Sequence, residues 1–235
     1  MTMTETDLRK LNADELEIYR EQGYVIVPDI FPLEELAEID REIDRLQETQ
    51  KKTGRNKGWI MQLGLRSEVT RQFAQDERVL TLIEDIVKPG ISIYSAKLTA
   101  KVPHSNDICH WHQDDAYYNT RVLSKTRMST WIPLQDADET NGCLWVVPQS
   151  HKGGVVTHGP FGGQCPKCMG PADLMFDDAI PCPVKAGDIL LFHACLWHHS
   201  KGNQTDHIRR AFIVSYQEAT VPRGNGDQYK ILRSA

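Results

Sequence analysis

The sequence lacks long apolar runs and any excess of basic residues. No apolar run approaches the ~18 residues that a membrane span requires, and the opening MTMTETDLRK lacks the basic-then-apolar pattern of a secretory signal. The net charge is −5, which argues against broad binding to nucleic acid or to an anionic membrane. We therefore expect a soluble, cytoplasmic protein, and the sequence leaves its oligomeric state open.

Cysteine occurs six times, but without the repeated spacing of a zinc ribbon. Cys165 and Cys168 form one C-x-x-C pair, with no second pair and no thioredoxin-like βαβ pattern around it. In a reducing compartment the cysteines are expected to remain thiols. We interpret this pair as two thiols in a loop, with a zinc or redox role as the less favoured alternative.

The order of helical and β-type patterns along the sequence predicts one domain, 1–235, in which helices precede strands. The N-terminal part, about 1–90, is predicted to be helical, beginning at a capping-box pattern of Asn12 and Glu15. From about 91 to 220, short β-rich runs separated by Gly, Pro, Asn and Asp predict a β-sandwich or barrel. No internal repeat or linker divides the chain.

The densest group of polar residues lies in CHWHQDDAYY. His112 and Asp114 form the only His-x-Asp or His-x-Glu of the sequence. Residues two apart on a strand share a face, and such a pair supplies two-thirds of the facial triad that holds non-haem Fe(II). A third histidine must come from a distant strand. The downstream candidates are His151, His158, His193, His198, His199 and His207.

Two arginines, Arg209 and Arg210, adjoin the apolar run AFIVSY. A buried arginine needs an anionic partner, and its planar fork binds a carboxylate through two parallel hydrogen bonds. A metal site combined with such an arginine suits a 2-oxo acid co-substrate. The ketone and near carboxylate would meet the metal, and the far carboxylate would meet the arginine.

Three motifs together resemble the phytanoyl-CoA dioxygenase family of Fe(II)/2-oxoglutarate-dependent oxygenases. They are WHQD, NGCLWVVPQSHKGG and HHSKGNQTDHIRRA, and the opening YREQGYVIVPDIFPLEEL and the string KLTAKVP are similar too. The resemblance runs from roughly residue 15 to residue 217. It implies a mainly β fold with flanking helices, namely a double-stranded β-helix (jelly roll, cupin-like) with N-terminal helices packed on the sheet.

The resemblance also implies roles for named residues. The metal ligands would be His112, Asp114 and His198, the last selected because it precedes the family's x-S-x-x-N string. The arginine for 2-oxoglutarate would be Arg209, eleven residues beyond His198. Further contacts to 2-oxoglutarate are expected from Ser200, Trp131, Lys97 and Gln62.

The implied activity is a dioxygenase reaction on a small-molecule metabolite. With Fe(II), 2-oxoglutarate and O₂ as cofactors, and ascorbate as an addition in vitro, the enzyme would hydroxylate a C–H bond and release succinate and CO₂. Desaturation, cyclisation or dealkylation are alternatives with the same cofactors. A non-oxidative, cupin-like metal-binding protein is the alternative from another class. The retained Asp114 argues against halogenation, since related halogenases have a small residue there.

Residues near the predicted ligands have alternative predicted roles. His110 would share the strand face of His112 and either face the substrate or lie at the rim. Tyr117 and Tyr118 would line either the substrate pocket or the core. Asp115 would face away from Asp114 and serve in a turn or an ion pair.

Two segments and one basic run complete the predictions. Segments 104–108 and 152–181 are candidates for substrate selection and for a lid. The run Arg121, Lys125 and Arg127 is interpreted as a solvated face, with a contact to an anionic substrate as the alternative.

Overall fold

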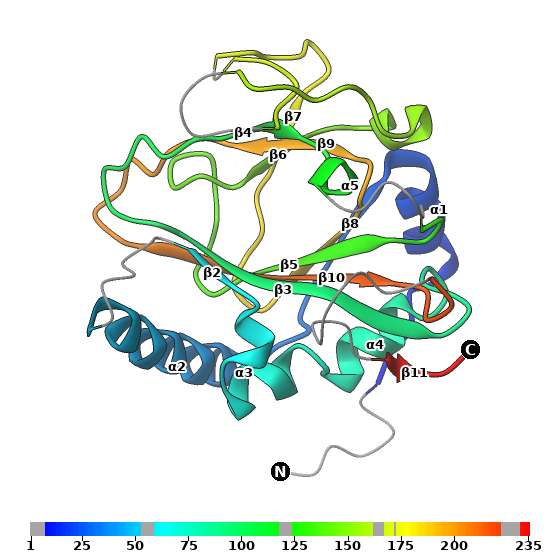
Figure 1. Ribbon diagram of the computed structural model, residues 1–235, viewed down its shortest axis with the longest axis horizontal. Coiled ribbons are helices and arrows are strands. Elements are labelled where there is room, and N and C mark those ends of the chain that lie inside the picture. The colour runs from blue at the N-terminus through cyan, green and yellow to red at the C-terminus, as the bar shows by residue number, and fades with distance from the viewer. Residues whose placement is uncertain (1–7, 53–58, 118–123, 162–166, 172, 222–230) are drawn as a thin grey trace.

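The computed structural model describes residues 8–52, 59–117, 124–161, 167–171, 173–221 and 231–235. Within these residues, two antiparallel sheets face each other (Figure 1). The large sheet has the order β1 (Tyr24–Val27), β8 (Ile189–His193), β5 (Met128–Pro133), β10 (Arg209–Gln217), β3 (Ile91–Lys101) and β11 (Ile231–Arg233), and β2 (Trp59–Met61) pairs with β3. The small sheet has the order β4 (Cys109–His112), β9 (Trp197–Ser200), β6 (Leu144–Val147) and β7 (Ile180–Cys182).

The chain passes repeatedly from one sheet to the other. From β3 to β10 every connection crosses to the other sheet except the one between β6 and β7, which are neighbours in the small sheet. This alternation is the double-stranded β-helix, so the predicted jelly roll is confirmed. The run DILLFHACLWHHS, which reads as one β-rich stretch, forms two strands because the chain turns at Ala194–Leu196 and enters the other sheet.

Helices α2 (Leu33–Lys52), α3 (Glu68–Phe73) and α4 (Glu77–Ile83) cover the outer side of the large sheet (Figure 1). Helix α1 (Ala13–Gln22) lies against β1 and β8 at the edge of that sheet. The short α5 (Asp114–Tyr117) and the 3₁₀ turns η2 (Leu63–Leu65) and η3 (Ser150–Gly153) lie elsewhere. The capping box predicted at α1 is confirmed: the side chain of Asn12 accepts a hydrogen bond from the Glu15 amide at 2.9 Å, and the reciprocal bond is present. Across the described part of the chain, the helices lack the combined length and apolarity that spanning a bilayer demands.

Strand β10 separates two buried environments, because its alternate residues point to opposite faces of the large sheet. Phe212, Val214 and Tyr216 pack into the core beneath the helices, where the rings of Phe212 and Phe73 lie 5.2 Å apart. Ala211 belongs to a second apolar cluster between the two sheets. The same alternation sends neighbouring Arg209 and Arg210 in opposite directions.

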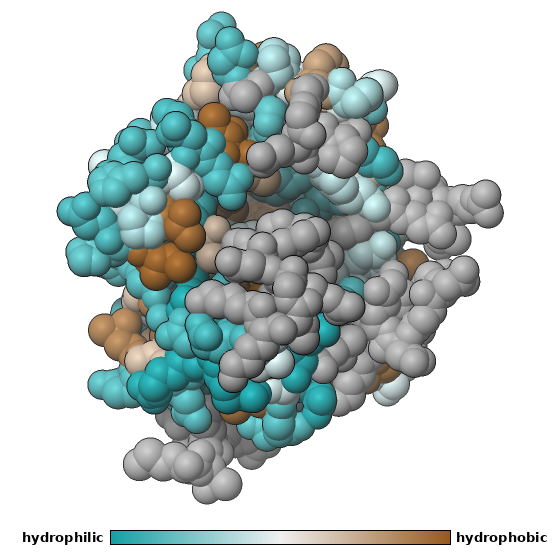
Figure 2. Space-filling view, turned by 60° about the vertical axis from the view of Figure 1, so that its left-hand side comes forward, coloured by the Kyte–Doolittle hydropathy of each residue, from teal (hydrophilic) through white to brown (hydrophobic). Residues whose placement is uncertain are grey.

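The surface is mainly polar on the side turned forward in Figure 2, where hydrophobic residues form separate small patches. Several exposed apolar side chains, among them Val155, Phe161 and Met175, belong to the segment 152–181.

The described part of this segment is hydrogen-bonded to β4: the Met169 amide donates to the Trp111 carbonyl at 2.9 Å, and the Trp111 indole donates to the Leu174 carbonyl at 2.8 Å. Whether the segment acts as a lid stays a prediction.

Candidate metal centre

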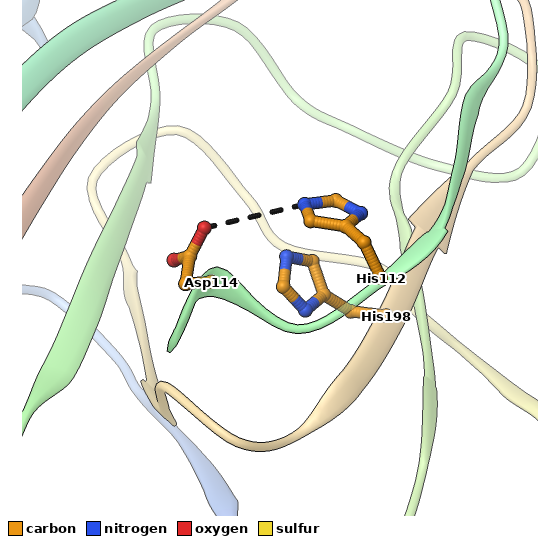
Figure 3. A group of neighbouring side chains, drawn as sticks. All are labelled: His112, Asp114 and His198. Atoms are coloured by element: carbon orange, nitrogen blue, oxygen red, sulfur yellow. Dashed lines mark ion pairs between the residues drawn. The ribbon is translucent and has the colours of Figure 1, made fainter. Parts of the chain in front are cut away.

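Two histidines face each other across the small sheet. His112 of β4 pairs directly with His198 of β9, and their ring centroids lie 4.1 Å apart (Figure 3). The Nδ1 of His112 bonds the His110 carbonyl at 2.7 Å, and the Nδ1 of His198 bonds the Leu196 carbonyl at 2.9 Å. Since Nδ1–H donates in each ring, the lone pair of each Nε2 is left for another partner.

Asp114 completes the group, although not from the strand position that the sequence predicted. Strand β4 ends at His112, and Asp114 is the first residue of α5. Its Oδ1 nevertheless lies 4.0 Å from the Nε2 of His112. The ligand atoms of the three residues lie within 4.8 Å of one another, and all three side chains are buried. One carboxylate and two imidazoles converging in this way match the facial triad.

The protonation states suit a divalent metal. Burial opposes ionisation of Asp114, but the Lys97 ammonium and the two histidines hold the pKa of its carboxyl well below the usual range. Burial and the neighbouring His112 lower the pKa of His198 to about 3, so this ring is neutral. The pKa of His112 is raised despite burial, because the Cys109 thiol and Asp114 favour a positive charge there. A carboxylate, a neutral imidazole and a place that favours positive charge are what a bound cation requires.

The inner face of the large sheet holds Asp114 in position. Ser129 of β5 donates to Asp114 Oδ2 at 2.6 Å, and its hydroxyl also bonds Ser215 of β10 at 2.9 Å. Lys97 of β3 donates to the other oxygen, Oδ1, at 3.2 Å. Each oxygen of the carboxylate therefore has its own partner, and Oδ1 is turned towards the histidines.

Arg209 extends from the same inner face and is only 2% exposed. Its Nη2 donates to the Gly142 carbonyl at 2.8 Å, and its guanidinium carbon lies 5.4 Å from the centre of the Trp131 ring. Its Nε and Nη1 find no hydrogen-bond partner among the described residues. A buried guanidinium with two unused donors in one plane is a receptor for a carboxylate.

The structure places the other predicted co-substrate residues around this inner face. Trp131 and Lys97 both pair with Ile213 of β10, from either side, so the three form one row across the sheet. Ser200 is buried two residues after His198, opposite Cys109. Gln62 follows β2, whose last residue pairs with Lys97. Their contacts with a co-substrate stay predictions.

The strand alternation around His110 is interrupted, and its role near the substrate stays a prediction. The pairing of β4 with β9 shifts between Cys109 and His112, so one extra residue is inserted in β4. A bulge breaks the two-residue period of the strand. The spacing of His110 and His112 therefore no longer implies that the two side chains share a face. Tyr117 packs its ring edge-on to His112 with centroids 5.6 Å apart. Tyr118 lies outside the described residues.

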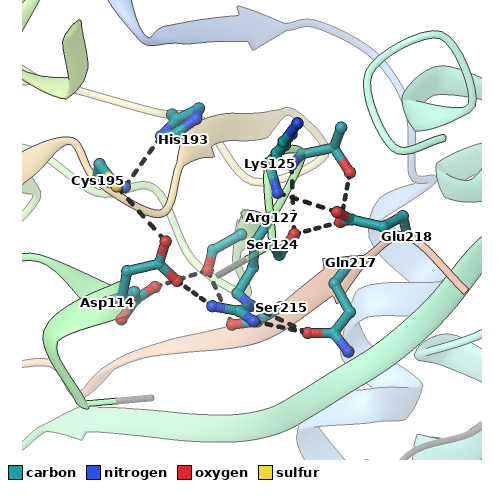
Figure 4. A network of polar contacts seen from close by, with 12 residues as sticks. Asp114, Ser124, Lys125, Arg127, His193, Cys195, Ser215, Gln217 and Glu218 are labelled. Atoms are coloured by element: carbon teal, nitrogen blue, oxygen red, sulfur yellow. Dashed lines mark hydrogen bonds and ion pairs between the residues drawn. The ribbon is translucent and has the colours of Figure 1, made fainter. Parts of the chain in front are cut away.

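A buried polar network lies behind the candidate site (Figure 4). Arg127, which is only 2% exposed, forms an ion pair with Asp115, and its Nη2 donates to Oε1 of Gln217 at 2.9 Å. The predicted ion-pair role of Asp115 is confirmed. The solvated-face interpretation is wrong for Arg127, because Asp115 supplies a buried counter-charge; Arg121 lies outside the described residues.

The thiol prediction is wrong for one cysteine. Cys168 is disulfide-bonded, and its partner lies outside the described residues, as does Cys165. The cysteines described as free are Cys109, Cys143, Cys182 and Cys195. The loop position of Cys168 is as predicted, and the amide of Cys168 bonds the Gly159 carbonyl at 2.9 Å.

Sequence reasoning missed Ser129, which belongs to no motif. The strand period alone offered a signal, because Ser129 lies two residues before Trp131 and therefore on the same face of β5. Gln113 was also missed. Although it sits between two predicted ligands, its fully buried amide faces elsewhere, donating to the carbonyls of Gly154 and Cys195 at 2.7 and 2.6 Å.

Solved structures share this fold over nearly the whole chain. The carbocyclase SnoK from nogalamycin biosynthesis, described as non-haem and alpha-ketoglutarate-dependent, superposes with a TM-score of 0.74 at 19% identity, covering 94% of this chain and 96% of that one. EctD from S. alaskensis, solved with 2-oxoglutarate and 5-hydroxyectoine, gives 0.74 at 19% identity, covering 91% of this chain and 78% of that one.

Sequence relatives carry one family name. A mouse protein, phytanoyl-CoA dioxygenase domain-containing protein 1, is 30% identical over 159 residues, which are 64% of this chain and 53% of that protein. The chain thus spans about half the length of the mouse relative. Human peroxisomal phytanoyl-CoA dioxygenase is 24% identical, over 91% of this chain and 70% of that protein. The family model described as Phytanoyl-CoA dioxygenase (PhyH) matches residues 19–211, and the chain belongs to this family.

Proposed function

We propose that the chain is an Fe(II)- and 2-oxoglutarate-dependent dioxygenase that oxidises a C–H bond of a small-molecule metabolite, by hydroxylation in the simplest outcome, with release of succinate and CO₂. The observation that carries this proposal is the buried group of His112, Asp114 and His198 beside an arginine, Arg209, with unused donors. The site within the described residues offers three ligands and one carboxylate receptor, which are the two requirements of this cofactor pair.

The chain's own residues would prepare the chemistry. His112 and His198 would bind iron through Nε2, and Asp114 through Oδ1. Iron and 2-oxoglutarate together would supply the activation of O₂. Ser129 keeps the second oxygen of Asp114 occupied and so favours binding through one oxygen.

At the other end of the site, the guanidinium of Arg209 would take the far carboxylate of 2-oxoglutarate, with Ser200 as a second contact. Trp131, fully buried beneath the guanidinium, would exclude water from that carboxylate. A charged hydrogen bond is strengthened where water is excluded. Orientation of the co-substrate would thus come from a metal at one end and a buried arginine at the other.

Two alternatives remain distinct from hydroxylation. Desaturation, cyclisation or dealkylation would use the same residues and differ in where the substrate lies; SnoK, which shares this fold, is described as a carbocyclase. A non-oxidative metal-binding protein would need the three ligands but would have no use for the unused donors of Arg209. We further propose a single-domain protein of the cytoplasm that acts on small molecules rather than on nucleic acid.

The direct test combines binding and turnover. The purified protein should bind Fe(II) without O₂, then bind 2-oxoglutarate, and should form succinate when ascorbate, O₂ and candidate metabolites are added. His112→Ala should lose Fe(II) binding while remaining folded. Binding of Fe(II) without any affinity for 2-oxoglutarate would favour the non-oxidative alternative, and failure to bind either would refute the proposal.

A further inference from the structure

A second buried cation lies beside Arg209. Lys101, at the end of β3, pairs directly with Arg209 across the β3–β10 ladder, so their side chains leave the same face of the sheet. Lys101 is 5% exposed. Its ammonium donates to the backbone carbonyl of Asp107, which is an uncharged partner.

The two cationic side chains meet at Gly142. Arg209 donates to the Gly142 carbonyl, and a Cβ built on Gly142 would stand 2.7 Å from Cδ and 3.1 Å from Cε of Lys101. With φ at +88°, Gly142 also has a backbone conformation that other residues rarely adopt. The absent side chain leaves room for the stem of Lys101 to reach the neighbourhood of the guanidinium.

Two like charges held this close require a third group between or beside them. Burial first, and then the charge of Arg209, lower the pKa of Lys101 to about 8, and Cys109 and Asp107 only partly offset this. Arg210, another buried cation of this sheet, has the carboxylates of Asp40 and Asp44 as partners. Among the hydrogen bonds recorded for Lys101 and Arg209, the acceptors are carbonyls. Such a pair favours an anion.

We propose that Lys101 is a second cationic contact for the far carboxylate of the 2-oxo acid co-substrate, shared with Arg209, and that it sets the preference of the site for dicarboxylic over monocarboxylic 2-oxo acids. This inference rests on the proposed function. It assigns Lys101 a specificity role that is separate from the metal ligands. The competing explanation is that Lys101 only braces the turn after β3 through the Asp107 carbonyl.

The test compares two co-substrates that differ only in the far carboxylate. Binding of 2-oxoglutarate and of 2-oxopentanoate is measured by titration calorimetry, without O₂, on Fe(II)-loaded wild type and on Lys101→Met. Loss of one charged hydrogen bond should weaken 2-oxoglutarate binding by about 10-fold or more. The binding of 2-oxopentanoate, which has no carboxylate at that end, should be unchanged.

Matched variants separate charge from structure. Lys201→Met removes another lysine near the site, one whose ammonium lies over the Trp145 ring, and should leave both affinities unchanged. Lys101→Arg keeps the charge and should retain most of the preference for 2-oxoglutarate. Thermal unfolding and circular dichroism confirm that each variant is folded.

The outcomes decide between the explanations. If Lys101→Met binds 2-oxoglutarate as tightly as wild type, or loses affinity equally for both acids, the inference is wrong and Lys101 has a structural role. If wild type itself binds no 2-oxoglutarate, the proposed function fails first. If Arg209→Met loses 2-oxoglutarate while Lys101→Met does not, only the role of Lys101 fails.

Discussion

The two faces of β10 each carry a buried arginine, and the two arginines have different partners. Arg210 points outward to α2, where it bonds Asp40 at 2.8 Å and Asp44 at 2.6 Å. Arg209 points inward, where its Nε and Nη1 meet no acceptor among the described residues. On the outer face the guanidinium of Arg210 has carboxylate partners from the protein, although its Nε also lacks a hydrogen-bond partner among the described residues. The hydrogen bond recorded for Arg209 goes to a backbone carbonyl and not to a carboxylate. The missing counter-charge, rather than burial alone, distinguishes the candidate binding residue from the structural one.

The largest loss of stability is expected for a substitution of Phe212. This residue lies between Ala211 and Ile213 in β10 and faces outward, whereas they face inward. Phe212→Ala removes a fully buried ring that packs on Phe73, and we expect a loss of about 3–5 kcal/mol in the free energy of unfolding. Urea denaturation measures the loss. The folded fraction should keep its Fe(II) affinity, and a loss of metal binding in folded protein would contradict the separation of the two faces.

The sharpest contrast in binding should come from Arg209→Met. Removing the guanidinium should weaken 2-oxoglutarate binding by about 100-fold, as for other buried charged contacts. The melting temperature should stay the same or rise, because the variant buries an apolar chain in place of an unpaired cation. Calorimetry and thermal unfolding test the two halves separately. A marked fall in melting temperature would show that the contacts of Arg209 with Gly142 and Trp131 stabilise the fold by more than the buried charge costs.

Ser129→Ala tests how far the inner face governs the metal. Without the hydroxyl, Asp114 Oδ2 loses its 2.6 Å hydrogen bond, and Fe(II) affinity should fall about 10–100-fold. Thr130→Val is the matched control, since Thr130 is the next residue on β5 and bonds the Val214 carbonyl instead. Equal Fe(II) affinities in the two variants would exclude a positioning role for Ser129.

The smallest effect is expected for Arg210→Met. Its two aspartate partners are partly solvated, with Asp44 62% exposed, so the ion pairs should contribute only about 1 kcal/mol. The melting temperature should fall by about 2–4 °C, and 2-oxoglutarate binding should not change. Arg209→Met should therefore weaken 2-oxoglutarate binding without lowering the melting temperature. Arg210→Met should lower the melting temperature without changing 2-oxoglutarate binding.

The sequence predicted the parts of the site that rest on local pattern. The spacing of His112 and Asp114, the motif around His198 and the resemblance to a family brought forward the three residues that the structure groups together. The α1 cap was predictable from a pattern of four residues, the short β-rich runs predicted a sandwich or barrel, and the resemblance to a family implied the jelly roll.

The remaining features depend on contacts between distant segments. The inserted residue between Cys109 and His112 exists only in the pairing of β4 with β9. The partner of Arg127 is twelve residues away in the chain and cannot be inferred from a basic run. Likewise, Lys101 faces Arg209 only because of the register of β3 against β10. A single sequence contains the periods of its strands but not the register between them.

The division of the metal group between the sheets has a consequence for how the protein folds. The small sheet alone brings His112 and His198 together, while the orientation of Asp114 depends on Ser129 and Lys97 in the large sheet. A partly folded chain with only one sheet in place would offer two ligands at most. Iron would therefore bind the closed barrel far more tightly than any intermediate. By mass action, bound iron would stabilise the state in which the two sheets are packed together.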